Sequence, residues 1–190
     1  MKKYKAVVFD LDGTLADTRL DFVKMREDLQ FPLGVSILEH LETLPLDKKD
    51  NANRIILEHE IAGAKSSTLT SGAKELLDHL EEKNIPMAIQ TRNCKDVTDL
   101  VIGKLKIPIS KVLTREDSRP KPDPHGFFQI AKDWNIDIKE ILYVGDSHYD
   151  LQTSLNAKSD FALFTNLHNE SKEINHPFSV SCLSQLISYF

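Results

Sequence analysis

The sequence lacks the features that mark several large classes of protein. No apolar run in its 190 residues approaches the roughly 18 residues of a membrane-spanning helix. Basic residues are not in excess, since 24 Lys and Arg stand against 29 Asp and Glu, which disfavours a protein that binds duplex nucleic acid. With 41% hydrophobic and 28% charged residues, disordered, collagen-like and low-complexity classes are excluded. We expect a globular protein of one domain, or one domain with a small insert, and no membrane or nucleic-acid partner.

Cysteine is also scarce. Cys94 and Cys182 could form at most one disulfide. The apolar run at residues 6–9 is too short to be the core of a secretory signal peptide. We therefore predict a cytoplasmic protein in which both thiols are reduced.

Short β-branched or aromatic runs alternate with longer helical patterns along most of the chain. We expect strands over residues 4–9, 85–90, 111–113, 141–144 and 161–164. Helices are predicted over 72–83 and 124–134, where apolar residues recur at i, i+3, i+4 and i+7; Asp123 would cap the second of them and Pro124 would be its first residue. This alternation predicts an α/β fold in which helices cover both faces of a parallel sheet.

One stretch interrupts the alternation. Residues 18–69 have helical patterns over 21–30, 34–44 and 47–62 and no convincing strand. We interpret them as a small helical insertion, which leaves residues 1–17 and 70–190 for the α/β domain. Residues 181–189 are predicted to form a short closing helix after an irregular, polar tail.

The strongest motif is DLDGT at residues 10–14, directly after the first predicted strand. Ligands of open parallel sheets bind at the carboxyl ends of the strands. Asp10 and Asp12 are two apart, so both side chains point the same way if the segment is extended. Two close carboxylates suit a nucleophile or ligand paired with an acid/base. Gly13 and Thr14 add a flexible turn and a hydroxyl where the backbone could approach an anion.

A matching motif, GDSHYD at residues 145–150, follows the fourth predicted strand. Asp146 and Asp150 are four apart, so both can lie on one face of the first turn of a helix. Acids on two neighbouring strand ends make an oxygen-rich site that suits Mg²⁺. Zinc is disfavoured because no His/Cys pair has ligand spacing.

Two further segments could bind an anion. Thr91, Arg92 and Asn93 follow the second predicted strand and are expected to start a helix, a suitable place for a phosphate. In RPKPDP at residues 119–124, prolines on both sides would hold Lys121 in a stiff, extended chain. Its ammonium group could neutralise the carboxylates and hold a phosphoryl oxygen.

Together these motifs resemble the haloacid dehalogenase-like hydrolase superfamily. DLDGT, Thr91, Lys121 and GDSHYD match its four signatures in order, and the helical insertion is similar to the family's cap of the first type. The resemblance implies a three-layer Rossmann-like core with a helical cap. The dehalogenases of this superfamily lack the second aspartate of the first motif, which is Asp12 here. The resemblance therefore also implies phosphoryl chemistry, as in phosphatases of the phosphoglycolate phosphatase type.

The resemblance also assigns roles to individual residues. Asp10 would attack phosphorus and form an aspartyl phosphate, and Asp12 would protonate the leaving group and then activate water. Thr91 and Lys121 would hold the transferring phosphoryl group. Mg²⁺ would be held by Asp10, the backbone carbonyl of Asp12 and Asp146, with support from Asp150 directly or through water.

Arg26, a charged residue of the insertion, has two possible roles. Phe22, Met25 and Leu29 form an apolar stripe, and Arg26 falls on the same stripe. A charge on a buried helix face needs a partner, so Arg26 makes either a structural ion pair or a contact with the substrate.

The sequence thus favours a Mg²⁺-dependent phosphatase that acts on a small phosphorylated metabolite, as a monomer or homodimer. Two alternatives stay open at this point. A sugar phosphomutase of the β-phosphoglucomutase type uses the same core, and a receiver-type phospho-acceptor domain also combines clustered acids with a Thr or Ser and a Lys.

Overall fold

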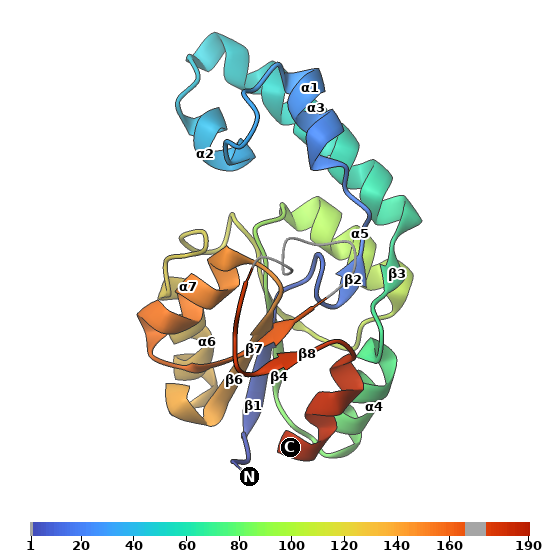
Figure 1. Ribbon diagram of the computed structural model, residues 1–190, viewed down its shortest axis with the longest axis vertical. Helices are drawn as coiled ribbons and strands as arrows, with labels where there is room; N and C mark the ends of the chain where they lie inside the picture. Colours follow the sequence, from blue (N-terminus) through green and yellow to red (C-terminus); the bar gives the residue numbers. More distant parts are fainter. Residues whose placement is uncertain (1, 166–173) are drawn as a thin grey trace.

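A six-stranded parallel sheet forms the centre of the molecule (Figure 1). The computed structural model describes residues 2–165 and 174–190. The strand order is β5-β4-β1-β6-β7-β8, and each neighbouring pair is parallel. The strands are β1 (Ala6–Phe9), β4 (Met87–Gln90), β5 (Lys111–Leu113), β6 (Ile141–Gly145), β7 (Asp160–Phe164) and β8 (Ser179–Val180). β1 is central, so the chain continues to β4 on one side of it and to β6 on the other.

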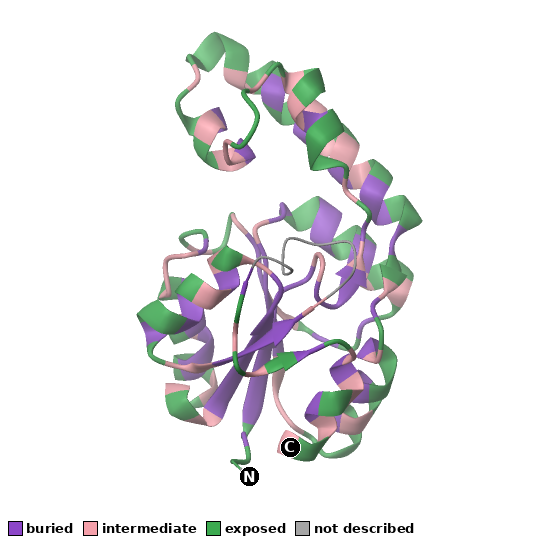
Figure 2. Cartoon of the chain, in the orientation of Figure 1, coloured by how far each residue is buried: buried purple, intermediate pink, exposed green. Residues whose placement is uncertain are grey.

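Helices cover both faces of this sheet, which confirms the predicted three-layer Rossmann-like fold. On one face lie α4 (Ala73–Glu82), α5 (Lys95–Leu105) and the 3₁₀ helix η3 (Leu183–Tyr189); on the other lie α6 (His125–Trp134) and α7 (His148–Ala157). The alternation of side chains in β1 divides the core: Val7 and Phe9 pack with α4 and α5, while Ala6 and Val8 pack with α6. All four are fully buried (Figure 2).

The predicted bounds of these elements need small corrections. The first two strands begin two residues later than expected, at Ala6 and Met87, because residue pairing with the neighbouring strands starts there or one residue later. Pro124 precedes α6 as its cap, and Asp123 Oδ1 accepts from the backbone N–H of His125 at 2.9 Å. The closing helix begins at Leu183 and is of the 3₁₀ type. Part of the tail predicted to be irregular, residues 166–173, lies outside the described residues.

Three helices form the unit above the sheet, as the pattern in residues 18–69 predicts. They are α1 (Phe22–Leu29), α2 (Ile37–Glu42) and α3 (Leu46–Ser66). They enclose a small apolar core of their own, made by Met25, Ile37, Leu41, Ala52 and Ile56. The carboxyl-terminal part of α3 packs on the main core through Ala64. We call residues 18–69 the cap; this division of the chain stays a prediction.

The cap joins the sheet domain through a ribbon that the sequence analysis missed. β2 (Ala16–Asp17) pairs antiparallel with β3 (Thr68–Leu69), so the expectation of no strand up to residue 69 is wrong. Each strand has only two residues and is defined by its partner, which a local pattern does not reveal.

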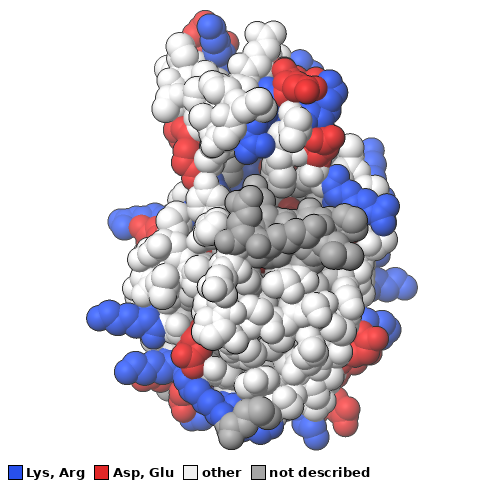
Figure 3. Space-filling model, viewed as in Figure 1, with Lys and Arg blue, Asp and Glu red and all other residues white. Residues whose placement is uncertain are grey.

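On the face shown in Figure 3, charged side chains of both signs lie on the cap and around the edge of the sheet domain, whose middle is largely uncharged. None of the described helices is long and apolar enough to cross a membrane. Cys94 and Cys182 are both free thiols.

Candidate active site

The candidate site lies at the carboxyl ends of β1, β4 and β6, the edge at which open parallel sheets bind ligands. A cavity of about 670 Å³ lies there between the sheet domain and the cap. Asp10, Asp12, Lys121 and Asp146 line its floor, and cap residues including Ile37 and Ile56 line the opposite side. A cavity of this size accommodates a small metabolite.

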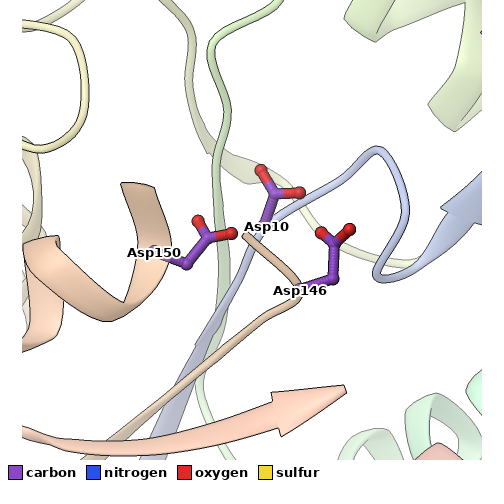
Figure 4. A group of neighbouring side chains, drawn as sticks. All are labelled: Asp10, Asp146 and Asp150. Atoms are coloured by element: carbon purple, nitrogen blue, oxygen red, sulfur yellow. The ribbon is translucent and has the colours of Figure 1, made fainter. Parts of the chain in front are cut away.

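Three carboxylates converge below the cavity, and two of them, Asp10 and Asp146, line it (Figure 4). Asp10 follows β1, Asp146 follows β6, and Asp150 lies in the first turn of α7. All three are buried, and one carboxylate oxygen from each lies within 4.8 Å of the others. The structure therefore brings together the acids that the two sequence motifs predict.

Lys121 supplies positive charge to this cluster. Its Nζ donates to Asp10 Oδ1 at 2.5 Å and to Asp150 Oδ1 at 2.6 Å, and the residue is only 3% exposed. Burial alone would lower the pKa of Lys121, but the Asp10 and Asp150 carboxylates outweigh it and hold the pKa well above its ordinary value. Lys121 is therefore a fixed cation beside the candidate nucleophile.

Residues of the loops after β1 and β6 fix the positions of the other two acids. Asp150 Oδ2 accepts from the backbone N–H of Ser147 at 3.0 Å and from its hydroxyl at 2.6 Å, in a capping box at the start of α7. Thr14 donates its hydroxyl to Asp146 Oδ1 at 2.9 Å. Gly13 has φ +82°, and a Cβ there would lie 2.3 Å from Asp146 Oδ2, so both the turn and the close approach require glycine. Gly13 and Thr14 thus shape the acidic cluster.

Asp12 lies apart from the three-acid group. The chain turns after β1, so Asp12 accepts a hydrogen bond from the Asn93 side-chain amide, and its Oδ1 is buried without a partner among the described residues. Burial raises the pKa of Asp12 to about 6, against the opposing effect of the hydrogen bond from Asn93. A carboxyl group with this pKa can both donate and accept a proton near neutral pH.

The charge balance of the floor fits a divalent cation. Burial, opposed by Lys121, raises the pKa of Asp10 to about 7. Burial and then the Asp10 and Asp150 carboxylates raise the pKa of Asp146 well above its ordinary value. Mg²⁺ prefers oxygen ligands and would relieve this crowding of buried negative charge. The residues present therefore suit the predicted ion.

The segment after β4 lies beside the same cavity, but it does not start a helix as predicted. Thr91 and Asn93 are buried, Cys94 is the cap residue, and α5 begins at Lys95. The Thr91 hydroxyl accepts from the backbone N–H of Asn93 at 3.1 Å, so it stabilises the turn that precedes the helix. Thr91, Arg92 and Asn93 all line the cavity.

Arg26 also lines the cavity, from the cap. Its Nε donates to the backbone oxygen of Val35 at 3.0 Å and its Nη1 to that of Phe22 at 3.1 Å. Within residues 2–165 and 174–190 it forms no ion pair, so the structural ion pair considered from the sequence is not observed. A contact with the substrate stays a prediction.

Sequence reasoning missed several residues around the cavity. Glu60 of α3 is buried and pairs with Arg115 of the sheet domain at 2.9 Å, and Arg115 Nη1 also donates to the backbone oxygen of Arg92. No periodicity distinguishes Glu60 from the other acids of its helix. Tyr149, by contrast, directly precedes Asp150 in the fourth motif, a position that could have drawn attention to it.

Comparison with known proteins agrees with this geometry. A family model described as haloacid dehalogenase-like hydrolase matches residues 25–164. The chain is 32% identical over 159 residues to a haloacid dehalogenase-like hydrolase domain-containing protein of Arabidopsis thaliana. These residues make up 78% of this chain and 65% of the plant protein. It is 30% identical to an uncharacterized hydrolase of Saccharomyces cerevisiae, over 98% of this chain and 91% of the yeast protein. The chain thus spans slightly less than two thirds of the plant relative and most of the yeast one.

Relatives with a named activity are more distant. The 6-phosphogluconate phosphatase of Escherichia coli is 27% identical over 93% of this chain and 89% of its own. Among solved structures, a predicted phosphoglycolate phosphatase from Haemophilus somnus superimposes with a TM-score of 0.76, at 20% identity, over 99% of this chain and 98% of that one. At this identity the superposition shows a shared fold.

Proposed function

The chain belongs to the haloacid dehalogenase-like hydrolase family, and we propose that it hydrolyses a small phosphate monoester with Mg²⁺, through an aspartyl phosphate on Asp10. The family match and the phosphatase relatives confirm the prediction of a phosphatase-type hydrolase. One observation carries the finer proposal: the buried carboxylate of Asp10 accepts a hydrogen bond from Lys121 and lies beside two further acids, while Asp12 lies outside this group.

In the first proposed step the Asp10 carboxylate attacks phosphorus. A bond forms between its oxygen and phosphorus, and the bond from phosphorus to the leaving oxygen breaks. Asp12 gives its proton to that oxygen. Lys121 lies beside Asp10, where it would hold a phosphoryl oxygen and offset the charge of the carboxylates. The Thr91 hydroxyl would hold a second phosphoryl oxygen.

In the second step water attacks phosphorus and releases Asp10. Asp12, now ionised, takes a proton from the water as the bond from phosphorus to Asp10 breaks. Its raised pKa of about 6 suits both roles in turn. The cap would exclude bulk water during the transfer.

Mg²⁺ would be held by Asp10, Asp146 and the backbone carbonyl of Asp12, with Asp150 supporting directly or through water. When bound, it would neutralise the acids and the charge on the phosphoryl group. The close approach of the Asp10, Asp146 and Asp150 carboxylates supports this proposed set of ligands.

We expect activity to require Mg²⁺. Removal of the metal with a chelator should abolish turnover, because three carboxylates would then face the phosphate, and added Mg²⁺ should restore it. Phosphate release before and after chelation, with metal content measured in parallel, tests this. Full activity in a preparation shown to contain no metal would overturn the metal assignment.

We expect Lys121→Ala to lower kcat by about 10²–10³, the typical effect of losing one donor to a developing charge. Loss of the cation also leaves Asp10 and Asp150 without their partner, so thermal melting should accompany the kinetics. Lys132→Ala, at an exposed position of α6, is the matched control and should have normal activity. Near-normal kinetics of Lys121→Ala would show that this lysine does no more than balance charge in the resting protein.

The activity itself is tested by a screen of phosphorylated metabolites with Mg²⁺. Release of inorganic phosphate over many turnovers is the expected result. A single phosphorylation without turnover would favour a phospho-acceptor domain, and isomerisation of a sugar phosphate without phosphate release would favour a mutase.

A further inference from the structure

A second cation borders the cavity, in surroundings unlike those of Lys121. Arg92 follows β4 in the sheet domain, and its guanidinium carbon lies 3.8 Å from the ring centroid of Tyr149 in α7. Such stacking holds the planar guanidinium in a fixed orientation. Both residues belong to the sheet domain, and the Tyr149 hydroxyl donates to Ser36 of the cap at 2.8 Å.

The partner of Arg92 is a carboxylate that comes from the cap. Arg92 Nη2 donates to Glu39 Oε1 of α2 at 2.7 Å. The Arg92 side chain is 16% exposed, whereas the Glu39 side chain is 51% exposed. Ion pairs with such an exposed member contribute little to stability, so Glu39 can be exchanged for another carboxylate at small cost.

The other terminal nitrogen of this guanidinium is unused. Arg92 Nη1 is buried and has no hydrogen-bond partner among the described residues. A buried donor without a partner is costly, and a guanidinium binds a carboxylate best through two parallel hydrogen bonds. Arg92 also lines the cavity, so its guanidinium has unused capacity for the oxygens of an anion that takes the place of Glu39.

We propose that Arg92 binds a carboxylate on the leaving group of the substrate, and that Glu39 of the cap holds this position until the substrate arrives. This inference rests on the proposed phosphatase function and narrows its substrate class to phosphate monoesters of small hydroxy acids. Met25, Ile37 and Ile56 line the cavity as well and suit a short carbon chain between the two anionic ends. Arg26 is less suited, because two of its nitrogens already bind backbone carbonyls.

The test compares matched substrates. A series of ω-carboxyalkyl phosphates of increasing chain length is assayed with Mg²⁺, each beside its uncharged carboxamide counterpart. The wild-type protein should prefer the carboxylate at one or more chain lengths. In Arg92→Gln the ratio of kcat/KM between the two should fall about tenfold or more, chiefly through KM. In Glu39→Gln, which removes the internal competitor, the same ratio should rise.

Glu42→Gln is the matched control. Glu42 lies on the same helix, α2, binds Lys49 at 2.9 Å and does not line the cavity, so its loss should leave the ratio unchanged. Equal losses on both substrates in Arg92→Gln would show that Arg92 only fastens the cap, and would overturn the inference while the proposed function stands. Equal use of carboxylates and carboxamides by the wild-type protein would also overturn it. Failure to hydrolyse any ester of either series or of the wider metabolite screen would contradict the proposed function itself.

Discussion

Replacement of Asp10 by asparagine is expected to reduce turnover to background, with a loss on the order of 10⁶ in kcat, as when a hydrolase loses its nucleophile. The amide cannot form the acyl phosphate. Asp10 directly follows the central strand and accepts from Lys121 at 2.5 Å, so its carboxylate is held at the site where the phosphoryl group is proposed to bind. Steady-state phosphate release measures the effect.

This loss has a second potential cause, because Asp10 also belongs to the proposed metal site. Raising the Mg²⁺ concentration separates the two: it should not rescue Asp10→Asn if the nucleophile is gone. Asp96→Asn, at an exposed position of α5, is the matched control for the substitution itself and should have normal activity. Recovery of Asp10→Asn to near-normal rates at high Mg²⁺ would reduce Asp10 to a metal ligand.

Asp12→Asn should behave differently, with both chemical steps slowed by about 10²–10⁴ on a substrate with a poor leaving group. The amide can neither protonate the leaving oxygen nor accept a proton from water. With an activated aryl phosphate the first step needs no proton, so Asp10 should still be phosphorylated while hydrolysis lags. Stopped-flow absorbance should then show a burst of phenol equivalent to one turnover.

A pair of substrates and a control variant serve as controls for this prediction. The ratio of rates between poor and activated leaving groups should increase in Asp12→Asn and stay unchanged in Asp96→Asn. Normal steady-state turnover of Asp12→Asn on both substrates would remove Asp12 from the mechanism. An equal loss on both, without a burst, would show that Asp12 acts through the shape of the site, for example through its bond with Asn93.

The sequence predicted those parts of the molecule that local pattern determines. The short apolar run of β1 and the apolar face of α4 are both visible in the sequence, and each is buried in the core as that pattern requires. The acids of the two motifs follow strands that are neighbours in the sheet, β1 and β6, so their convergence could be expected from topology.

What the sequence did not predict depends on contacts between distant segments. β2 and β3 are strands only because they pair with each other across the whole cap. Asp12 and Asp10 were expected to point the same way, but the chain turns after β1 and Asp12 reaches Asn93 instead. The pairing of Arg92 with Glu39 joins residues of the sheet domain and the cap that no spacing rule connects.

The central claim is that the phosphoryl group passes through Asp10, and one measurement tests it directly. Asp12→Asn is mixed with an activated aryl phosphate and Mg²⁺, quenched rapidly in acid, and examined by intact-protein mass spectrometry followed by peptide mapping. The account predicts a single added phosphoryl group, located on Asp10 and absent from a parallel sample of Asp10→Asn. Phosphorylation of another residue, a label on Asp10→Asn, or release of phenol without any labelled protein would contradict it.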